Sequence, residues 1–64
     1  MNLNEYLRKV TNRLMELMQI DVLYFESNEL ARKYYAKVKY FFAEDFPIDL
    51  AAEELQPFIR SLFN

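Results

Sequence analysis

The sequence predicts an all-α fold: one small three-helix domain, residues 1–64, that is dimeric or bound to a partner. Three segments carry apolar residues at helical spacing, no two segments have the composition of pairing strands, and the 64 residues include no glycine. A chain of this length buries a small core and often gains stability from a partner subunit. We therefore expect a single domain with an interface.

The first predicted helix runs from Leu3 to Met18. Asn2 is its expected N-cap, with Glu5 three residues later. Continuing the helix would place Asp21 in the middle of the apolar stripe, so we expect it to end near Gln19. The apolar side chains expected on its buried face are Leu3, Tyr6, Leu7, Val10, Leu14, Leu17 and Met18.

The second predicted helix runs from Leu30 to Glu44. Ser27 or Asn28 is expected to cap it, and Pro47 to end it, because the residue before a proline is disfavoured in helical conformation. Its expected buried face consists of Leu30, Ala31, Tyr34, Tyr35, Val38, Phe41 and Phe42.

The third predicted helix covers Leu50 to Phe63, with Asp49 as its cap. Pro57 lies on the polar side of this helix and removes one main-chain hydrogen bond. We expect a kink there, or a break into two short pieces. The expected buried face consists of Ala51, Ala52, Leu55, Phe58, Ile59, Leu62 and Phe63.

The segment from Ile20 to Phe25 follows neither the helical period nor a clean strand alternation. Five of its six residues are large and apolar: Ile20, Val22, Leu23, Tyr24 and Phe25. They cannot all face one small core, and exposed apolar patches mark interfaces. The sequence leaves two interpretations open, a partner-binding contact, which we favour, and a buried connector.

A second predicted contact surface lies on the otherwise polar side of the second helix. Ala36 and Ala43 are one heptad apart with Tyr40 between them, and small residues allow another helix to approach closely. The alternative is that these alanines are exposed helix formers.

Catalytic, metal and cofactor sites are not expected. The chain has no Cys, His, Gly or Trp, which excludes the usual zinc, haem, iron–sulfur and glycine-rich phosphate sites. Its non-tyrosine hydroxyls, Thr11, Ser27 and Ser61, have no histidine to act as a base. We expect no enzymatic activity and no cofactor.

A nucleic-acid-associated accessory factor is the alternative function. The second helix mixes aromatic residues with Arg32, Lys33, Lys37 and Lys39, a composition that can stack on bases and neutralise phosphates. The helical period places these four basic side chains along two edges of the apolar stripe instead of in one band. The net charge of the chain is −2. A nucleic-acid partner is therefore disfavoured.

Short stretches of this sequence resemble motifs of two known families. Asn4–Leu7, Ser27–Leu30 and Phe58–Arg60 resemble the Hha/YmoA group of small helical partners of nucleoid proteins, but Ala36–Lys39 stands where that family has Ala-Asp-His-Arg. Ser27–Leu30 also resembles a short sporulation-phosphatase family, whose acidic residue after the leucine is Ala31 here. These motifs assign no function.

The expected function is non-catalytic protein binding. Chains of this size and composition are typical of small regulators, adaptors or inhibitors, including phage- or plasmid-type modulators of a host protein. The expected partner is another protein or a second copy of this chain. We expect a cytoplasmic location and no membrane contact, since no apolar run approaches the roughly 20 residues of a membrane helix.

Overall fold

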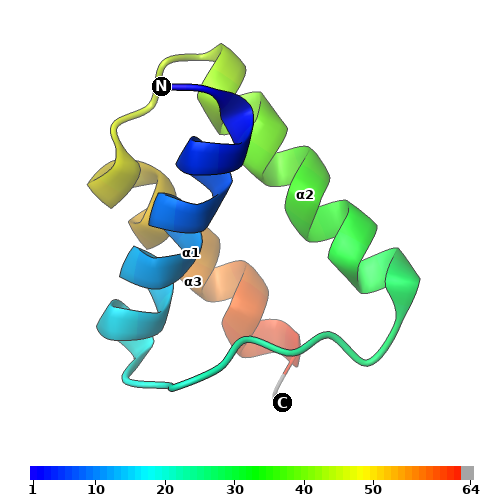
Figure 1. Ribbon diagram of the computed structural model, residues 1–64. Coiled ribbons are helices and arrows are strands. Elements are labelled where there is room, and N and C mark those ends of the chain that lie inside the picture. The colour runs from blue at the N-terminus through cyan, green and yellow to red at the C-terminus, as the bar shows by residue number, and fades with distance from the viewer. Residues whose placement is uncertain (63–64) are drawn as a thin grey trace.

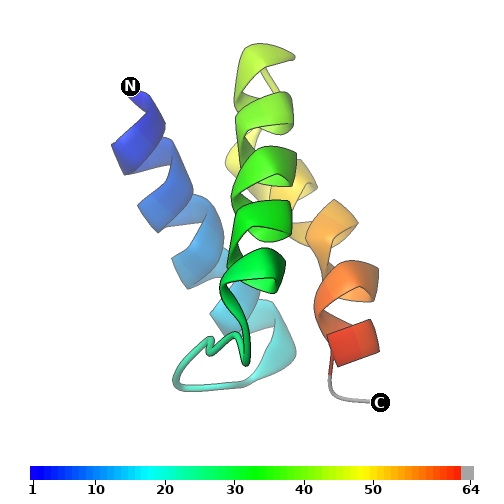
Figure 2. The ribbon, with the colours of Figure 1, turned by 90° about the vertical axis from the view of Figure 1, so that its right-hand side faces the viewer.

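The computed structural model describes residues 1–62 as three helices (Figure 1). Helix α1 spans Leu3–Met18, α2 spans Asn28–Ala43 and α3 spans Ile48–Leu62. The contact between α1 and α3 is the most extensive, and α2 packs on both (Figures 1 and 2). The predicted all-α three-helix fold is confirmed.

Both predicted N-caps of the first two helices form. The Asn2 Oδ1 atom accepts a hydrogen bond of 2.8 Å from the main-chain N–H of Glu5, and the Ser27 Oγ atom accepts one of 3.3 Å from that of Leu30. Each bond satisfies a main-chain donor that has no partner within the helix. Of the two candidate caps for α2, the structure therefore selects Ser27.

The first two helices end in the same turn geometry although the chain lacks glycine. Gln19 and Asp45 both adopt the left-handed conformation, with φ of 56° and 57°. At the end of α2 the Phe46 N–H donates to the Phe41 carbonyl and the Asp45 N–H to the Phe42 carbonyl. This is a Schellman turn, and the Phe41 and Phe46 rings stack beside it at 4.7 Å. Helix α2 thus ends at Ala43 through the turn at Asp45, before the chain reaches Pro47.

For the third helix, the predicted cap is wrong, and of the kink or break expected at Pro57 the break does not form. Helix α3 begins at Ile48, because the Pro47 carbonyl already accepts the Ala51 N–H at 3.0 Å, so Asp49 lies inside the first turn and is not the cap. The helix also runs through Pro57 without a break. Pro57 is exposed, and so is Glu53, whose carbonyl the missing N–H leaves free for water. The predicted end at Phe63 lies outside the described residues.

The core is formed by one face of each helix. Tyr35, predicted to be buried, is 39% exposed, because it lies at the edge of the apolar stripe of α2. Apolar side chains such as Leu7, Leu17, Phe41 and Phe42 pack around the buried cluster. The fully or almost fully buried side chains are Tyr6, Val10, Leu14, Tyr34, Val38, Ala51, Ala52, Leu55 and Ile59.

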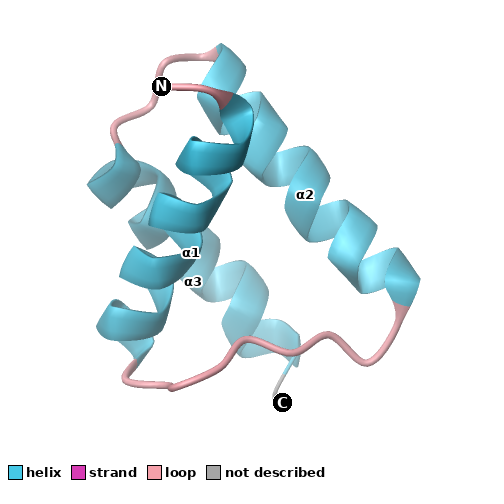
Figure 3. Ribbon diagram, viewed as in Figure 1, coloured by secondary structure: helices cyan, strands magenta, loops and turns pink. Residues whose placement is uncertain are grey.

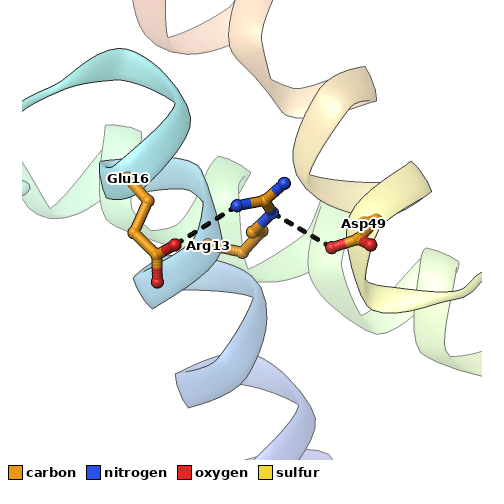
Figure 4. A network of polar contacts seen from close by, with 3 residues as sticks. All are labelled: Arg13, Glu16 and Asp49. Atoms are coloured by element: carbon orange, nitrogen blue, oxygen red, sulfur yellow. Dashed lines mark hydrogen bonds and ion pairs between the residues drawn. The ribbon is translucent and has the colours of Figure 1, made fainter.

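An ion pair joins α1 to α3 across the main helix contact. The Arg13 Nε atom in α1 lies 3.0 Å from the Asp49 Oδ1 atom in α3, and its Nη1 atom lies 3.2 Å from Glu16 (Figure 4). The Asp49 side chain is 77% exposed. Water screens such a pair, so it orients α3 and adds at most about 1 kcal/mol of stability.

Candidate protein-binding surface

The segment from Val22 to Phe25 has no regular secondary structure and alternates between core and solvent. It lies within the loop that runs from the end of α1 to the start of α2 (Figure 3). Leu23 and Phe25 pack against the core, whereas Val22 is 71% exposed and Tyr24 is 72% exposed. Leu23 and Phe25 thus pack as a connector does, and within this segment only Val22 and Tyr24 offer a large free surface. Partner binding by the segment stays a prediction.

The inward-facing residues hold this segment in place. The Phe25 ring lies 5.2 Å from the ring of Tyr34 in α2, and Tyr34 lies edge-on to Phe58 of α3 at 6.4 Å. The Tyr34 hydroxyl is 2.6 Å from the Thr11 Oγ1 atom in α1. Burial raises the pKa of Tyr34, and its hydrogen bond with Thr11 opposes that rise. Phe25 therefore anchors the segment to a cluster that involves all three helices.

An apolar hollow of about 220 Å³ lies beside the two exposed side chains. Val22 and Tyr24 form one wall, and Leu30 from the first turns of α2 and Leu62 from the end of α3 complete it. Among residues 1–62, Glu26 is the one charged residue of the lining. We call this surface the Val22/Tyr24 patch: Val22, Tyr24, Leu30 and Leu62, with Glu26 at its edge.

Acidic residues lie close to Val22 and Tyr24 in the sequence. Asp21, Glu26 and Glu29 are all exposed, and the stretch from Asp21 to Glu29 contains no basic residue. Glu29 is engaged by Lys33, whose Nζ atom lies 3.7 Å from its Oε1 atom. Glu26 therefore places one negative charge at the edge of the hollow.

The remaining predicted contact residues lie elsewhere. Ile20 is half-buried and borders a separate, open depression at the end of α1. Ala36, Tyr40 and Ala43 are exposed on the outer side of α2, where the Tyr40 ring rests 6.4 Å from that of Phe46. The structure therefore divides the predicted contact residues between separate surfaces.

Three of the four predicted nucleic-acid contacts have partners within the chain. Lys33 pairs with Glu29, as described, the Lys37 Nζ atom lies 5.5 Å from the centre of the Phe58 ring, and the Lys39 Nζ atom lies 5.6 Å from that of Tyr35. Arg32 is exposed. The lysines border the aromatic side chains, as expected for long cationic stems that cover apolar surface.

The hydroxyl groups considered as nucleophiles have local structural roles. Thr11 bonds to Tyr34, Ser27 caps α2, and the Ser61 hydroxyl donates a hydrogen bond of 2.7 Å to the Phe58 carbonyl. Between residues 1 and 62, no group of three or more acidic side chains is placed to hold a metal ion. In the same part of the chain, no helix has the length and hydropathy needed to span a membrane.

Comparison with known proteins finds no matching family model, no matching curated protein and no matching solved structure.

Sequence reasoning did not find Leu30, Leu62 and Glu26 as parts of the patch. Leu30 and Leu62 are 32 positions apart and meet only because α3 ends beside the start of α2. No local pattern encodes such a meeting. The alternating burial from Val22 to Phe25 did have a local signal, since odd and even positions differ in direction in any extended chain.

Proposed function

We propose that this chain is a non-catalytic protein-binding domain, a small regulator or adaptor, and that the Val22/Tyr24 patch is its contact surface. The supporting observation is the exposure of two large apolar side chains, both above 70%, beside an apolar hollow. Exposing this much apolar surface costs free energy in water, and a partner that covers it recovers that free energy.

The alternation along the segment supports the same proposal. Val22 and Tyr24 contribute little to the core, so folding alone does not require large apolar residues at these positions. Leu23 and Phe25 fix the segment from the inner side, so the exposed pair is held on a supported backbone. A contact residue that is already fixed loses less conformational entropy when the partner binds.

Affinity capture with matched variants tests this proposal. The purified chain, Tyr24→Ser and Leu50→Ser are immobilised and exposed to lysate of the source cells, and the retained proteins are quantified by mass spectrometry. Leu50 is the control because it is an exposed apolar residue, at 41%, on α3 and outside the patch. Circular dichroism confirms that each bait is folded.

The proposal predicts one set of proteins that the unchanged chain and Leu50→Ser retain equally. We expect Tyr24→Ser to reduce their recovery at least about tenfold, since aromatic residues at the centre of an interface contribute roughly 2 kcal/mol or more. Equal recovery by all three baits would contradict the proposal. The parallel variant Tyr40→Ser tests the outer surface of α2, and selective loss with that variant would assign the contact there instead.

A further inference from the structure

The main chain beside the Val22/Tyr24 patch is free to form hydrogen bonds. In residues 1–62, no hydrogen bond to a protein group involves the main chain from Asp21 to Glu26. The side chains of Val22 and Tyr24 point outward between inward-facing Leu23 and Phe25. A stretched segment with free N–H and carbonyl groups can pair with another extended chain, the mode called β-augmentation.

The hollow has the size for a side chain of that second chain. Its volume of about 220 Å³ lies below the range of roughly 300–1,000 Å³ that is typical of pockets for small molecules. Its walls are the apolar groups of Val22, Tyr24, Leu30 and Leu62. One large aliphatic side chain, inserted between Tyr24 and Leu62, would lose its contact with water there.

The charge at the edge of the patch selects the chemistry of the partner. A second copy that docked the same patch would bring its own Glu26 and no basic residue, since the lining described between residues 1 and 62 contains none. Like charges brought together at an interface oppose association. A partner with lysine or arginine beside its apolar anchor would instead form a pair of opposite charge with Glu26.

We infer that the Val22/Tyr24 patch binds an extended segment of a partner protein that carries one aliphatic residue flanked by lysine or arginine. The aliphatic side chain enters the hollow, a basic side chain pairs with Glu26, and the main chain pairs with the stretch from Val22 to Phe25. This inference rests on the proposed function and adds the class of partner.

Three synthetic peptides test the inference in titrations of the isotope-labelled protein, followed by nuclear magnetic resonance. The probe is acetyl-Thr-Lys-Thr-Ile-Thr-Lys-Thr-amide, in which the isoleucine and both lysines share one side of an extended chain. The second peptide has glutamate in place of both lysines. The third keeps the side chains of the probe but has methylated main-chain nitrogens at the two central threonines.

We expect the lysine peptide to bind saturably with a Kd below about 1 mM and to shift the amide signals of Val22 to Phe25, Leu30 and Leu62. The glutamate peptide and the methylated peptide should each bind at least about tenfold more weakly, since each lacks one kind of contact. Glu26→Gln should weaken binding of the lysine peptide, and Glu53→Gln, a matched change at an exposed position outside the patch, should leave it unchanged.

Three results would overturn the inference: no saturable binding of the lysine peptide, equal binding of the glutamate peptide, or signal shifts outside the patch. Shifts of the patch amides on concentrating the protein alone would show that a second copy is the occupant. If peptide binding fails while Tyr24→Ser still abolishes capture of the cellular partner, the class of partner is wrong and the proposed function stands. If both fail, the patch is not the contact surface.

Discussion

The Tyr6 hydroxyl in α1 donates a hydrogen bond of 2.8 Å to the main-chain carbonyl of Phe46, in the turn between α2 and α3. The Tyr6 ring also lies 5.2 Å from the ring of Phe42 in the last turn of α2. The start of α1 is thereby tied to the turn that follows α2 (Figure 1). This contact fixes the end of the bundle that is remote from the Val22/Tyr24 patch.

Tyr6→Phe should lower the free energy of unfolding by about 1 kcal/mol, because the change removes one hydrogen bond and keeps the ring. The midpoint of urea denaturation measures this effect. Tyr40→Phe is the matched control, since Tyr40 is 58% exposed and has no side-chain hydrogen bond among residues 1–62. Equal midpoints for the two variants would contradict a stabilising role of the Tyr6 hydroxyl.

The protein should lose stability in alkaline solution partly through Tyr34. Burial raises the pKa of its hydroxyl, so the folded state favours the protonated form more than the unfolded state does. The resulting stability is present below about pH 10, the usual tyrosine pKa, and is lost as pH rises through the raised pKa.

Urea midpoints at about pH 8 and about pH 11 test this linkage. The decrease between them should be smaller in Tyr34→Phe than in the unchanged chain. Tyr24→Phe, a control at an exposed position, should show the same decrease in the urea midpoint as the unchanged chain. A decrease in Tyr34→Phe as large as that of the unchanged chain would show that Tyr34 does not carry the effect.

Glycine should stabilise the two left-handed helix ends. Gln19→Gly and Asp45→Gly relieve the steric cost of positive φ, which offsets the greater freedom of glycine in the unfolded chain. We expect each change to raise the free energy of unfolding by up to about 1 kcal/mol. Ala36→Gly, inside α2, should lower it by about 1 kcal/mol. Thermal denaturation of all three variants shows whether each change raises or lowers stability. Destabilisation by both Gln19→Gly and Asp45→Gly would refute the left-handed turn geometry.

The helices and their first caps were predictable because local interactions determine them. Asn2 and Ser27 bond to main-chain groups three residues away, and the apolar spacing within each helix identifies most of the buried face. The start of α3 was missed by two residues because the Pro47 carbonyl opens the helix, which a search for a polar cap overlooks.

Long-range contacts set the features that the sequence did not reveal. Tyr34 and Tyr35 are neighbours on one stripe, yet only Tyr34 reaches Thr11 and becomes buried. The sequence identified the apolar segment from Ile20 to Phe25, but its division into core and surface residues depends on the Tyr34 ring, which packs against Phe25 and also against Phe58 of α3. The hollow likewise needs the end of α3 beside the start of α2.

The division between core and surface residues is the central claim, and charged substitutions at two adjacent positions test it most directly. Leu23 packs against the core and Val22 is 71% exposed. Leu23→Asp should abolish the cooperative urea transition, because an unpaired charge placed against the core at this half-buried position costs several kcal/mol and a domain this small has only about 5 kcal/mol in reserve. Val22→Asp should keep the cooperative transition, with a free energy of unfolding within about 0.5 kcal/mol of that of the unchanged chain. Unfolding by Val22→Asp, or an unchanged transition in Leu23→Asp, would contradict the account.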